Sequence, residues 1–404
     1  MPRFEPFHGL RYDDEVAPPS EVIAPPYDVV DDVERRRLAE RSPYNAIHIE
    51  LPVGPPSEKY LNASKILRSW LNEGVLRRDD VPAFYAYRMR YTDETGTGRS
   101  TVGVIGALEM DVVGAGNVLP HERTMPKPKG DRLDLLRATG INTSPIWGLS
   151  LATGLGAIAS SAMEEHVPLA ATDDDGVVHE LSPITDLATI EKITALVGSE
   201  PVVIADGHHR YETATFFRAE TREHNGDVEG PHDLVMALIV ELSSDELFVE
   251  PIHRLISGLP DGFDVAAAMS TYFTVEPGPA DPAALIVAGR ERGSLGLVTA
   301  EGNMLLRPLP AVEEAAAADL DSCRLDIALA TFPVHELVYQ HGARIAADAV
   351  KNKVSQAAVL LRPATVNQIA ETAHSGVRMP PKTTFFSPKP RTGLVYREAR
   401  TPST

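Results

Sequence analysis

Residues 202–214 have the sequence VVIADGHHRYETA, and the fold around them follows from this stretch. Its first four residues are apolar, which is typical of a buried strand. Gly207 comes directly after Asp206 and lets the backbone turn sharply and approach other groups closely. The residues after the glycine have the composition of a helix that starts near His208 or His209. The stretch therefore predicts a buried strand, a glycine turn and a helix.

The first turn of that helix would gather groups that bind phosphate. Free N–H groups and the helix dipole attract anions at a helix N-terminus, and Gly207 leaves the backbone open to a ligand. His208, His209 and Arg210 add side-chain donors at the same point. Asp206 can hold Mg²⁺ or orient a histidine. The alternative is that Asp206 only caps the helix while both histidines are surface residues, but the density of donors favours the phosphate site.

Outward from this stretch, the pattern predicts an α+β fold. AFYAYRMRY (83–91) and STVGVIGALEM (100–110) flank a polar glycine-containing connection, which indicates a long hairpin. NAIHIELP (45–52) alternates like a strand, and apolar segments near Leu285 and Leu295 also suggest strands. At about 100–200 residues per domain, the chain divides into two or three units.

We predict three parts along the chain. Residues 1–250 form a catalytic or ligand-binding core, residues 251–345 form a second, smaller α+β unit, and residues 346–404 pack back on the core.

A second segment dense in charge, PHERTMPKPKGDR (120–132), precedes a predicted helix. Lys129 and Arg132 can neutralise charge on phosphoryl oxygens, and His121 or Glu122 can accept a hydroxyl proton. Asp131 is expected to cap the helix. The alternative is a solvated loop whose charges pair with one another.

Four further residues are candidate substrate contacts, and one is a candidate phosphate contact. Prolines stiffen the segment before Tyr27 and Asp28, so that Tyr27 can stack on a base or bond a ligand; a turn with a half-buried tyrosine is the alternative. Asn142 and Ser144 offer polar groups to a substrate, although turn chemistry explains them equally well. Lys382 follows two prolines and can contact phosphate, or it is a surface lysine.

The composition limits the partners. The 404 residues include 38 Lys and Arg and 57 Asp and Glu, a net charge of −19. Such a chain has no general attraction for nucleic acid or an anionic membrane, so an anion must be bound at a local site. The single cysteine, Cys323, and the absence of an apolar leader predict a cytoplasmic protein, and a homo-oligomer is compatible with the sequence.

Several motifs resemble an uncharacterised bacterial and archaeal family known as domain of unknown function 1015. They are APPYDV (24–29), HERT (121–124), KGDRLDLL (129–136), NTSPI (142–146), IADGHHRYETA (204–214), PIHRL (251–255) and MPPKTTFF (379–386). The DGHHR turn alone is similar to the phosphate-binding turn of the ParB/sulfiredoxin superfamily, which includes a free-serine kinase. That resemblance implies a mixed-sheet core and binding of nucleotide phosphates at residues 207–210. Partition proteins of that superfamily carry a helix-turn-helix and basic surfaces, which this acidic chain lacks.

Three functions follow as hypotheses. The first is an enzyme that transfers or hydrolyses a phosphoryl group on a small hydroxy metabolite, with ATP, ADP or CTP and Mg²⁺; the kinase resemblance suggests serine or phosphoserine. The second is a non-catalytic nucleotide sensor. The third is a metal-dependent hydrolase using His121, Asp206 and His208, although no HxxxH spacing supports zinc. We expect Arg210→Ala to abolish ligand binding and leave the fold intact, because the turn faces solvent.

Overall fold

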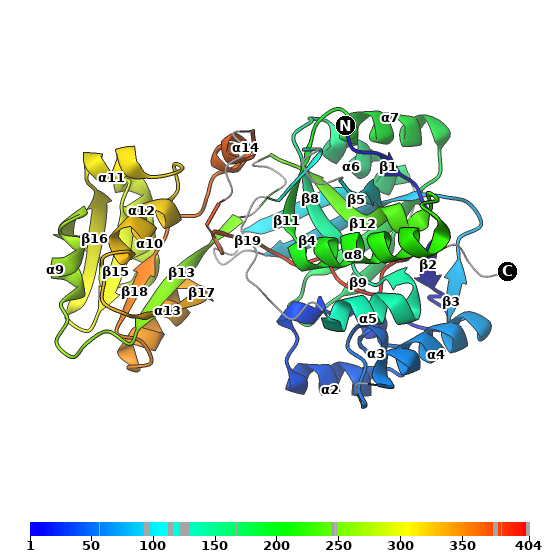
Figure 1. The fold of residues 1–404 in the computed structure, drawn as a ribbon, viewed down its shortest axis with the longest axis horizontal. Helices are drawn as coiled ribbons and strands as arrows, with labels where there is room; N and C mark the ends of the chain where they lie inside the picture. The colour runs from blue at the N-terminus through cyan, green and yellow to red at the C-terminus, as the bar shows by residue number, and fades with distance from the viewer. Residues whose placement is uncertain are drawn as a thin grey trace. The chain divides into compact units, whose positions relative to one another are not determined.

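The structure is a computed structural model of the 404-residue chain. It describes all residues except 56, 93–96, 112–115, 121–129, 166–167, 244–246, 248, 375–378, 381 and 401–404, and the side chains of 120, 373 and 374. The described chain forms two compact units (Figure 1). The first contains residues from 1–120, 126–247 and 388–404, and the second contains residues from 248–387.

The first unit is built on a large mixed sheet. Its strands follow the order β6-β11-β8-β12-β5-β4-β10-β9, and β1 also pairs with β5. The β11–β6 and β12–β8 pairs are parallel, whereas β4 and β5 form the antiparallel hairpin that the sequence predicts. The strands are β1 (Phe4–Glu5), β4 (Phe84–Thr92), β5 (Gly98–Glu109), β6 (Val118–Pro120), β8 (Ile146–Ser150), β9 (Leu169–Thr172), β10 (Val178–Ile184), β11 (Val202–Asp206) and β12 (Leu234–Glu241).

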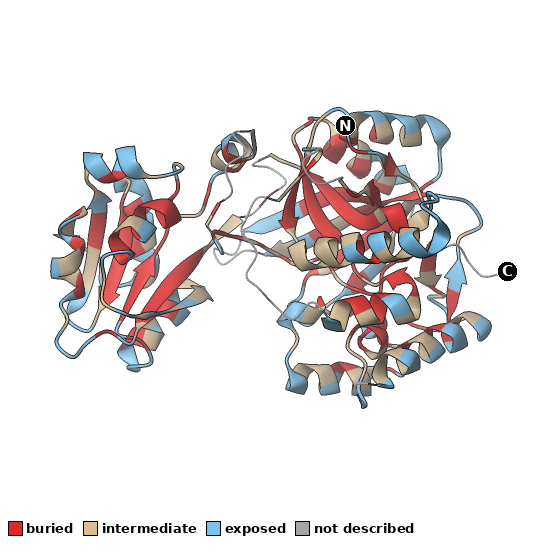
Figure 2. Ribbon diagram, viewed as in Figure 1, coloured by how far each residue is buried: buried red, intermediate tan, exposed pale blue. Residues whose placement is uncertain are grey.

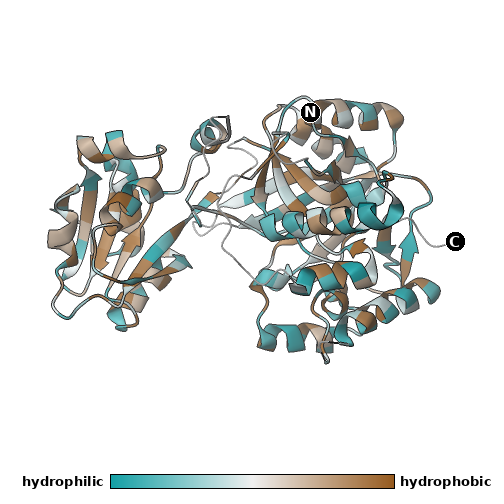
Figure 3. Ribbon diagram, viewed as in Figure 1, coloured by the Kyte–Doolittle hydropathy of each residue, from teal (hydrophilic) through white to brown (hydrophobic). Residues whose placement is uncertain are grey.

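Three longer helices pack against this sheet, and its central strands are buried (Figure 2). They are α6 (Leu155–Glu165), α7 (Leu187–Val197) and α8 (His208–Asn225). Ile204 of β11, Ile239 of β12 and Ala214 of α8 belong to one apolar cluster, so the strand–turn–helix at residues 202–214 is anchored in the core. The strands β5, β8 and β12 are correspondingly apolar (Figure 3).

A small sheet with its own helices completes the first unit. Its order is β3-β2-β20-β7, which joins residues from both ends of the chain. The strands are β2 (Gly9–Tyr12), β3 (Leu76–Arg78), β7 (Ile141–Asn142) and β20 (Tyr396–Glu398). The helices are α1 (Pro19–Val22), α2 (Asp32–Arg41), α3 (Ile47–Glu50), α4 (Lys59–Asn72) and α5 (Gly130–Thr139), with the 3₁₀ turns η1 (Tyr27–Val29) and η2 (Pro231–Asp233).

The strand predicted at residues 45–52 is wrong, because this segment contains the one-turn helix α3. The Asn45 side chain accepts a hydrogen bond from the Ile47 N–H at 3.0 Å and donates to the carbonyls of Glu21 and Ile23. The short-range bond to Ile47 favours a turn over a strand. Ile47, Ile49 and Glu50 are all buried, so the alternation of apolar residues reflects one tightly packed turn.

The second unit contains an antiparallel sheet in the order β14-β16-β15-β18-β13-β17, with β19 pairing with β13. The strands are β13 (Val249–Ser257), β14 (Phe273–Pro277), β15 (Leu295–Thr299), β16 (Gly302–Pro308), β17 (Glu336–His341), β18 (Ala357–Leu360) and β19 (Thr384–Phe386). The helices are α9 (Val265–Met269), α10 (Pro282–Arg292), α11 (Pro310–Ala315), α12 (Asp321–Leu329), α13 (Ala343–Lys351) and α14 (Val366–His374).

Leu285 lies in α10 and not in a strand, because Asp281 caps the helix by accepting from the Ala284 N–H at 2.9 Å and Pro282 starts it. The α+β class is confirmed in both units. Residues 346–387 belong to the second unit here, and the division of the chain into independently folding domains stays a prediction.

Candidate functional site

The predicted strand, turn and helix are confirmed, because β11 ends at Asp206 and α8 begins at His208. Gly207 connects them with φ 86° and ψ 24°, a left-handed conformation that L side chains rarely adopt. A Cβ at this position would lie 3.0–3.1 Å from the Arg210 guanidinium. The glycine is therefore required twice, once by the turn and once by the arginine that folds back over it.

Asp206 is held between two cations. Its carboxylate accepts a hydrogen bond from Arg210 Nη2 at 2.8 Å and another from the Lys389 ammonium group. Burial alone would raise the pKa of Asp206, but Lys389 and Arg210, with His208 nearby, lower it to about 2. Asp206 makes no side-chain capping bond to α8, so it is an ion-pair centre and not a helix cap.

Arg210 does not face solvent as the sequence suggests. Its side chain is only 13% exposed, and besides Asp206 it donates to Ser144 Oγ at 3.3 Å and to the Pro145 carbonyl. These bonds link α8 to the segment before β8. We therefore correct the expectation that Arg210→Ala leaves the fold unaffected, because the substitution breaks a partly buried ion pair.

Five of the predicted site residues line one narrow cavity of about 50 Å³ in the first unit. They are Tyr27, Arg132, Asn142, Ser144 and Arg210. Because these residues come from four separate sequence motifs, only the tertiary structure brings them together. Glu50, Thr143 and Thr213 also line this cavity, which we call the Arg132–Arg210 cavity.

Arg132 organises one wall of the cavity. Its guanidinium lies 4.6 Å from the centre of the Tyr27 ring, so one face of that ring is already covered. It donates to the Glu50 carbonyl at 2.7 Å and to the Asp131 carboxylate at 2.6 Å. Burial raises the pKa of Tyr27. The phenol therefore stays protonated at neutral pH.

Asp131 does not have the predicted capping role, because α5 already begins at Gly130. Its carboxylate instead accepts hydrogen bonds from Lys59 Nζ at 2.7 Å and Tyr60 Oη at 2.6 Å, in addition to Arg132. Burial opposes ionisation, but these donors lower the pKa of Asp131 well below its ordinary value. The residue fixes Arg132 at the cavity.

Of the other predicted substrate residues, Asn142 is buried and Asp28 is exposed. Asn142 is buried in β7, and its Oδ1 accepts from the Met236 N–H and from Arg397 Nη1, both at 3.1 Å. The side-chain amide oxygen of Asn142 therefore already accepts two hydrogen bonds from the protein. Asp28 is exposed in η1 and is not among the residues that line the cavity.

His209 lies on the first turn of α8, with its Nδ1 3.8 Å from Glu212 Oε2. Three predicted residues, His121, Glu122 and Lys129, lie outside the described residues. Lys382 is exposed in the second unit, with an unusual positive φ of 59°.

Two residues of the site, Lys389 and Glu50, are not predicted from the sequence. Lys389 stands between two prolines near the C-terminus, far in sequence from Asp206, and only its proline context hinted at a rigid position. Glu50 lay in the segment interpreted as a strand. The only signal in the sequence was an acidic residue, Glu50, within a mostly apolar segment.

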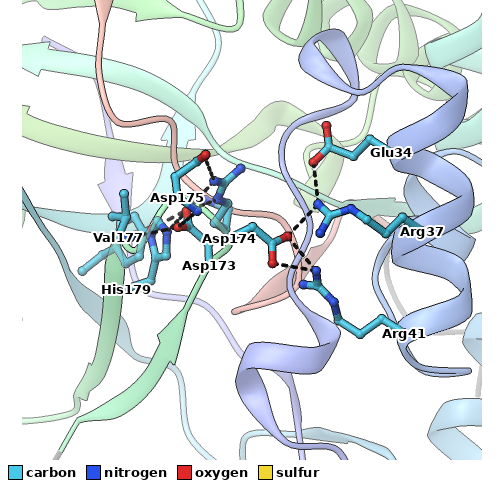
Figure 4. A network of polar contacts seen from close by, with 10 residues as sticks. Glu34, Arg37, Arg41, Asp173, Asp174, Asp175, Val177 and His179 are labelled. Atoms are coloured by element: carbon cyan, nitrogen blue, oxygen red, sulfur yellow. Dashed lines mark hydrogen bonds and ion pairs between the residues drawn. The ribbon is translucent and has the colours of Figure 1, made fainter.

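The C-terminal segment that carries Lys389, residues 388–400, is fastened to the β9–β10 turn through Arg391. The Arg391 guanidinium binds Asp173 and also Asp175, at 3.0 Å. Asp173 in turn contacts His179 Nε2 at 2.9 Å, and Asp174 next to it binds Arg37 and Arg41 of α2 (Figure 4). This network places Lys389 within reach of Asp206.

His179 is fully buried within this network. Its Nδ1 lies 2.7 Å from the Tyr87 hydroxyl, and burial lowers the pKa of its imidazole despite Asp173. The ring is therefore neutral, donating from Nε2 to the carboxylate and accepting from Tyr87.

The residues do not fit a resident Mg²⁺. In the part of the chain that the structure describes, no three His, Cys, Asp or Glu side chains gather to hold a metal ion. Asp206 is already bonded to two cations.

A family model described as "Protein of unknown function (DUF1015)" matches residues 4–328. The chain belongs to this family. The DUF1015 match includes the Arg132–Arg210 cavity and the turn at Gly207, whereas Lys382 and Lys389 lie beyond it. No curated protein matches the DUF1015 chain. No helix in its described portion is long and apolar enough to cross a membrane.

Several solved structures resemble this DUF1015 protein. A mutant free serine kinase in complex with AMP has 15% identity and a TM-score of 0.37, covering 69% of this chain and 87% of the kinase. A conserved hypothetical protein from Pyrococcus furiosus has 14% identity and a TM-score of 0.37, covering 69% and 90%. SbnI with a C-terminal truncation, from Staphylococcus aureus, has 10% identity and a TM-score of 0.37, covering 73% and 87%. Likeness at this level carries no argument about the site.

Proposed function

We propose that this protein binds the phosphates of a nucleotide at residues 207–210 and transfers a phosphoryl group to a small hydroxy metabolite. The first unit would then be a core of the ParB/sulfiredoxin type. One observation carries the proposal: a left-handed glycine joins a buried strand to an 18-residue helix, beside a cavity lined by two arginines.

The helix start supplies the donors. The N–H groups of the first turn of α8 have no partner within the helix, and the dipole makes this end positive. Gly207 has no side chain of its own and leaves room for the Arg210 guanidinium directly over the turn, so a phosphate there would meet both backbone N–H groups and this arginine. In a chain with a net charge of −19, such a local site captures a small anion without attracting nucleic acid.

Arg210 and Lys389 bracket Asp206 at the same place. Their positive charges lie where a phosphate would collect negative charge, and Asp206 holds both side chains in place before the ligand arrives. Preformed donors of this kind need little rearrangement during phosphoryl transfer. We infer that Arg210 and Lys389 stabilise the transferring group and that Asp206 orients them.

The reaction would balance as follows. The hydroxyl oxygen of the acceptor forms a bond to the γ-phosphorus of a Mg²⁺–nucleoside triphosphate, and the bond from that phosphorus to the β–γ bridging oxygen breaks. The nucleoside diphosphate leaves with the electron pair of the broken bond, and the hydroxyl proton passes to a base. Among the described residues we assign this base to His209, which lies on the first turn of α8. His121, Glu122, Lys129 and Lys382 stay as proposed contributors.

Calorimetry and thermal shift with ATP, ADP, CTP, GTP and phosphoserine, each with Mg²⁺, test the binding step. A ligand present at 100 times its Kd should stabilise the protein by about 2.7 kcal/mol. Absence of any stabilisation contradicts the proposal. Binding without transfer to a panel of small alcohols and hydroxy amino acids, or without phosphate release, would instead indicate a sensor.

A matched pair of variants tests the base. His209→Ala at the start of α8 should lower turnover by roughly 100-fold, because general base catalysis contributes on that order. His224→Ala, an exposed histidine at the other end of the same helix, should leave turnover unchanged. Equal activity of both variants would remove His209 from the mechanism.

A further inference from the structure

Glu50 is a buried carboxylate that faces the Arg132–Arg210 cavity. Its side chain is 1% exposed, at the end of the one-turn helix α3. One carboxylate oxygen, Oε2, has no hydrogen-bond partner among the described residues. A buried acceptor without a donor is costly, so a site of this kind is stabilised by a ligand that donates to it.

The nearest cation does not satisfy this carboxylate. Arg132 Nη1 lies 3.8 Å from Glu50 Oε1, which is an ion-pair distance but too long for a hydrogen bond. The same nitrogen donates to the Glu50 carbonyl at 2.7 Å. The other guanidinium donors point to Asp131, with bonds of 3.0 and 2.6 Å. The Arg132 guanidinium therefore donates its hydrogen bonds to other acceptors and not to the Glu50 carboxylate.

The cavity has room for a small polar group at Glu50. A volume of about 50 Å³ is enough for a group such as an ammonium group. An ammonium group also has three donors and a positive charge, which match a buried carboxylate with an open oxygen.

We propose that Glu50 binds the ammonium group of the acceptor, so that the substrates are amino alcohols or hydroxy amino acids and not simple hydroxy acids. This inference rests on the proposed phosphoryl transfer at residues 207–210. Arg210 lines the same cavity, which places the ammonium contact next to the phosphate turn. Thr143 and Thr213 contribute further polar groups to the cavity lining.

The contact between Glu50 and the ammonium group would decide which acceptors bind. An acceptor without the ammonium group would leave the Glu50 carboxylate buried and unpaired. Sites built to bond a polar group discriminate strongly against analogues that lack it. We therefore expect L-serine to bind at least tenfold more tightly than 3-hydroxypropanoate, which has the same hydroxyl and carboxylate but no ammonium group.

Calorimetry on the full chain with L-serine, L-threonine, ethanolamine and 3-hydroxypropanoate, each in the presence of ADP, tests this inference. In the wild-type protein the three amines should bind and 3-hydroxypropanoate should bind at least tenfold more weakly. In Glu50→Gln the preference should disappear, with ADP affinity within threefold of wild type. Glu40→Gln, an exposed glutamate on α2, is the control and should keep the preference.

The wild-type comparison needs no substitution, so it stands even if Glu50→Gln fails to fold. Equal affinity for L-serine and 3-hydroxypropanoate, or no binding of any amine, overturns the inference about Glu50. A preference that persists in Glu50→Gln overturns it as well. Loss of ADP binding in the wild-type protein would instead contradict the phosphate site, and the two failures are thus distinguishable.

Discussion

At the scale of single residues, the site depends on charges that are paired before any ligand binds. Asp206 draws Arg210 from the following helix turn and Lys389 from the C-terminal segment to one point. A carboxylate with a lowered pKa stabilises the fold only while it is ionised. Its contribution is therefore present above the unfolded pKa and is lost as the pH falls through the folded one.

The pKa of Asp206, about 2 in the folded protein, gives a pH prediction. Relative to an ordinary aspartate, the pairing contributes on the order of 2 kcal/mol above pH 4, and about 1 kcal/mol of this is lost by pH 3. Urea denaturation of wild type and Asp206→Asn from pH 6 to pH 3 should show their difference in unfolding free energy shrinking as the pH falls. A constant difference would contradict the ionised pairing.

Gly207 gives a second prediction at this scale. Gly207→Ala should lower the unfolding free energy by about 1–2 kcal/mol, because an L side chain is strained at φ 86°. It should also weaken ADP binding, since its Cβ would displace Arg210. Gly74→Ala is the control, with φ 75° and no atom within 4 Å of its Cβ. It should show a similar stability loss with unchanged ADP binding; equal ADP affinity in both variants would contradict the role of the turn.

At the scale of elements, the C-terminal segment acts as a clamp on the first unit. Arg391 binds Asp173, and the backbone of Thr392 pairs with Ala24, just before the motif that carries Tyr27. The segment therefore holds two parts of the site, Lys389 and the start of the Tyr27 turn. This short segment can hold both parts in place because Arg391 and Thr392 are bonded to the Asp173 side chain and to Ala24, which are both buried.

Arg391 and Arg37 bind adjacent aspartates with different burial, which allows a direct comparison. The Arg391–Asp173 side chains are 9% and 5% exposed, whereas the Arg37–Asp174 side chains are 50% and 45% exposed. Arg391→Ala should cost about 3–5 kcal/mol, because it leaves a buried charge unpaired. Arg37→Ala should cost at most about 1 kcal/mol. Denaturant unfolding measures both, and equal losses would refute the clamp.

At the scale of the whole molecule, the second unit is an insertion with adjacent ends. Its first and last strands pair antiparallel, with Val249 opposite Phe386. Neighbouring residues in such a pair are separated by only about 5 Å between Cα atoms. The polypeptide can therefore leave and return to the first unit without a long connection.

A chain in which residues 249–386 are replaced by a short Gly-Ser linker should fold. The first unit has its own apolar cores, so we expect cooperative urea unfolding and a monodisperse elution profile. The full-length chain, measured in parallel, is the reference. An aggregated or unfolded product would show that the first unit depends on the second. ADP binding by the shortened chain would assign the phosphate site to the first unit alone.

Much of the local structure was predictable from the sequence. The buried strand, the glycine turn and the start of α8 follow from 13 consecutive residues, because apolar runs, glycine and helix-forming residues act over short distances. The β4–β5 hairpin followed from the same kind of local pattern, whereas the DUF1015 family was indicated by the resemblance of several motifs. The errors at residues 45–52 and near Leu285 arose where a short-range bond from a side chain to the backbone decides between a helical turn and a strand.

The site itself was only partly predictable. Tyr27, Arg132, Asn142, Ser144 and Arg210 were singled out one motif at a time, and the sequence contains no information on their distance from one another. Lys389 and Glu50 were missed, because a lysine between prolines and a glutamate at the end of an apolar turn are unremarkable as sequence. The sequence by itself determined the chemistry available at each position and the turn at Gly207. Which charges meet, and which carboxylate is left with an open oxygen in a cavity, was decided by the tertiary structure, because burial and pairing depend on residues far apart in the chain.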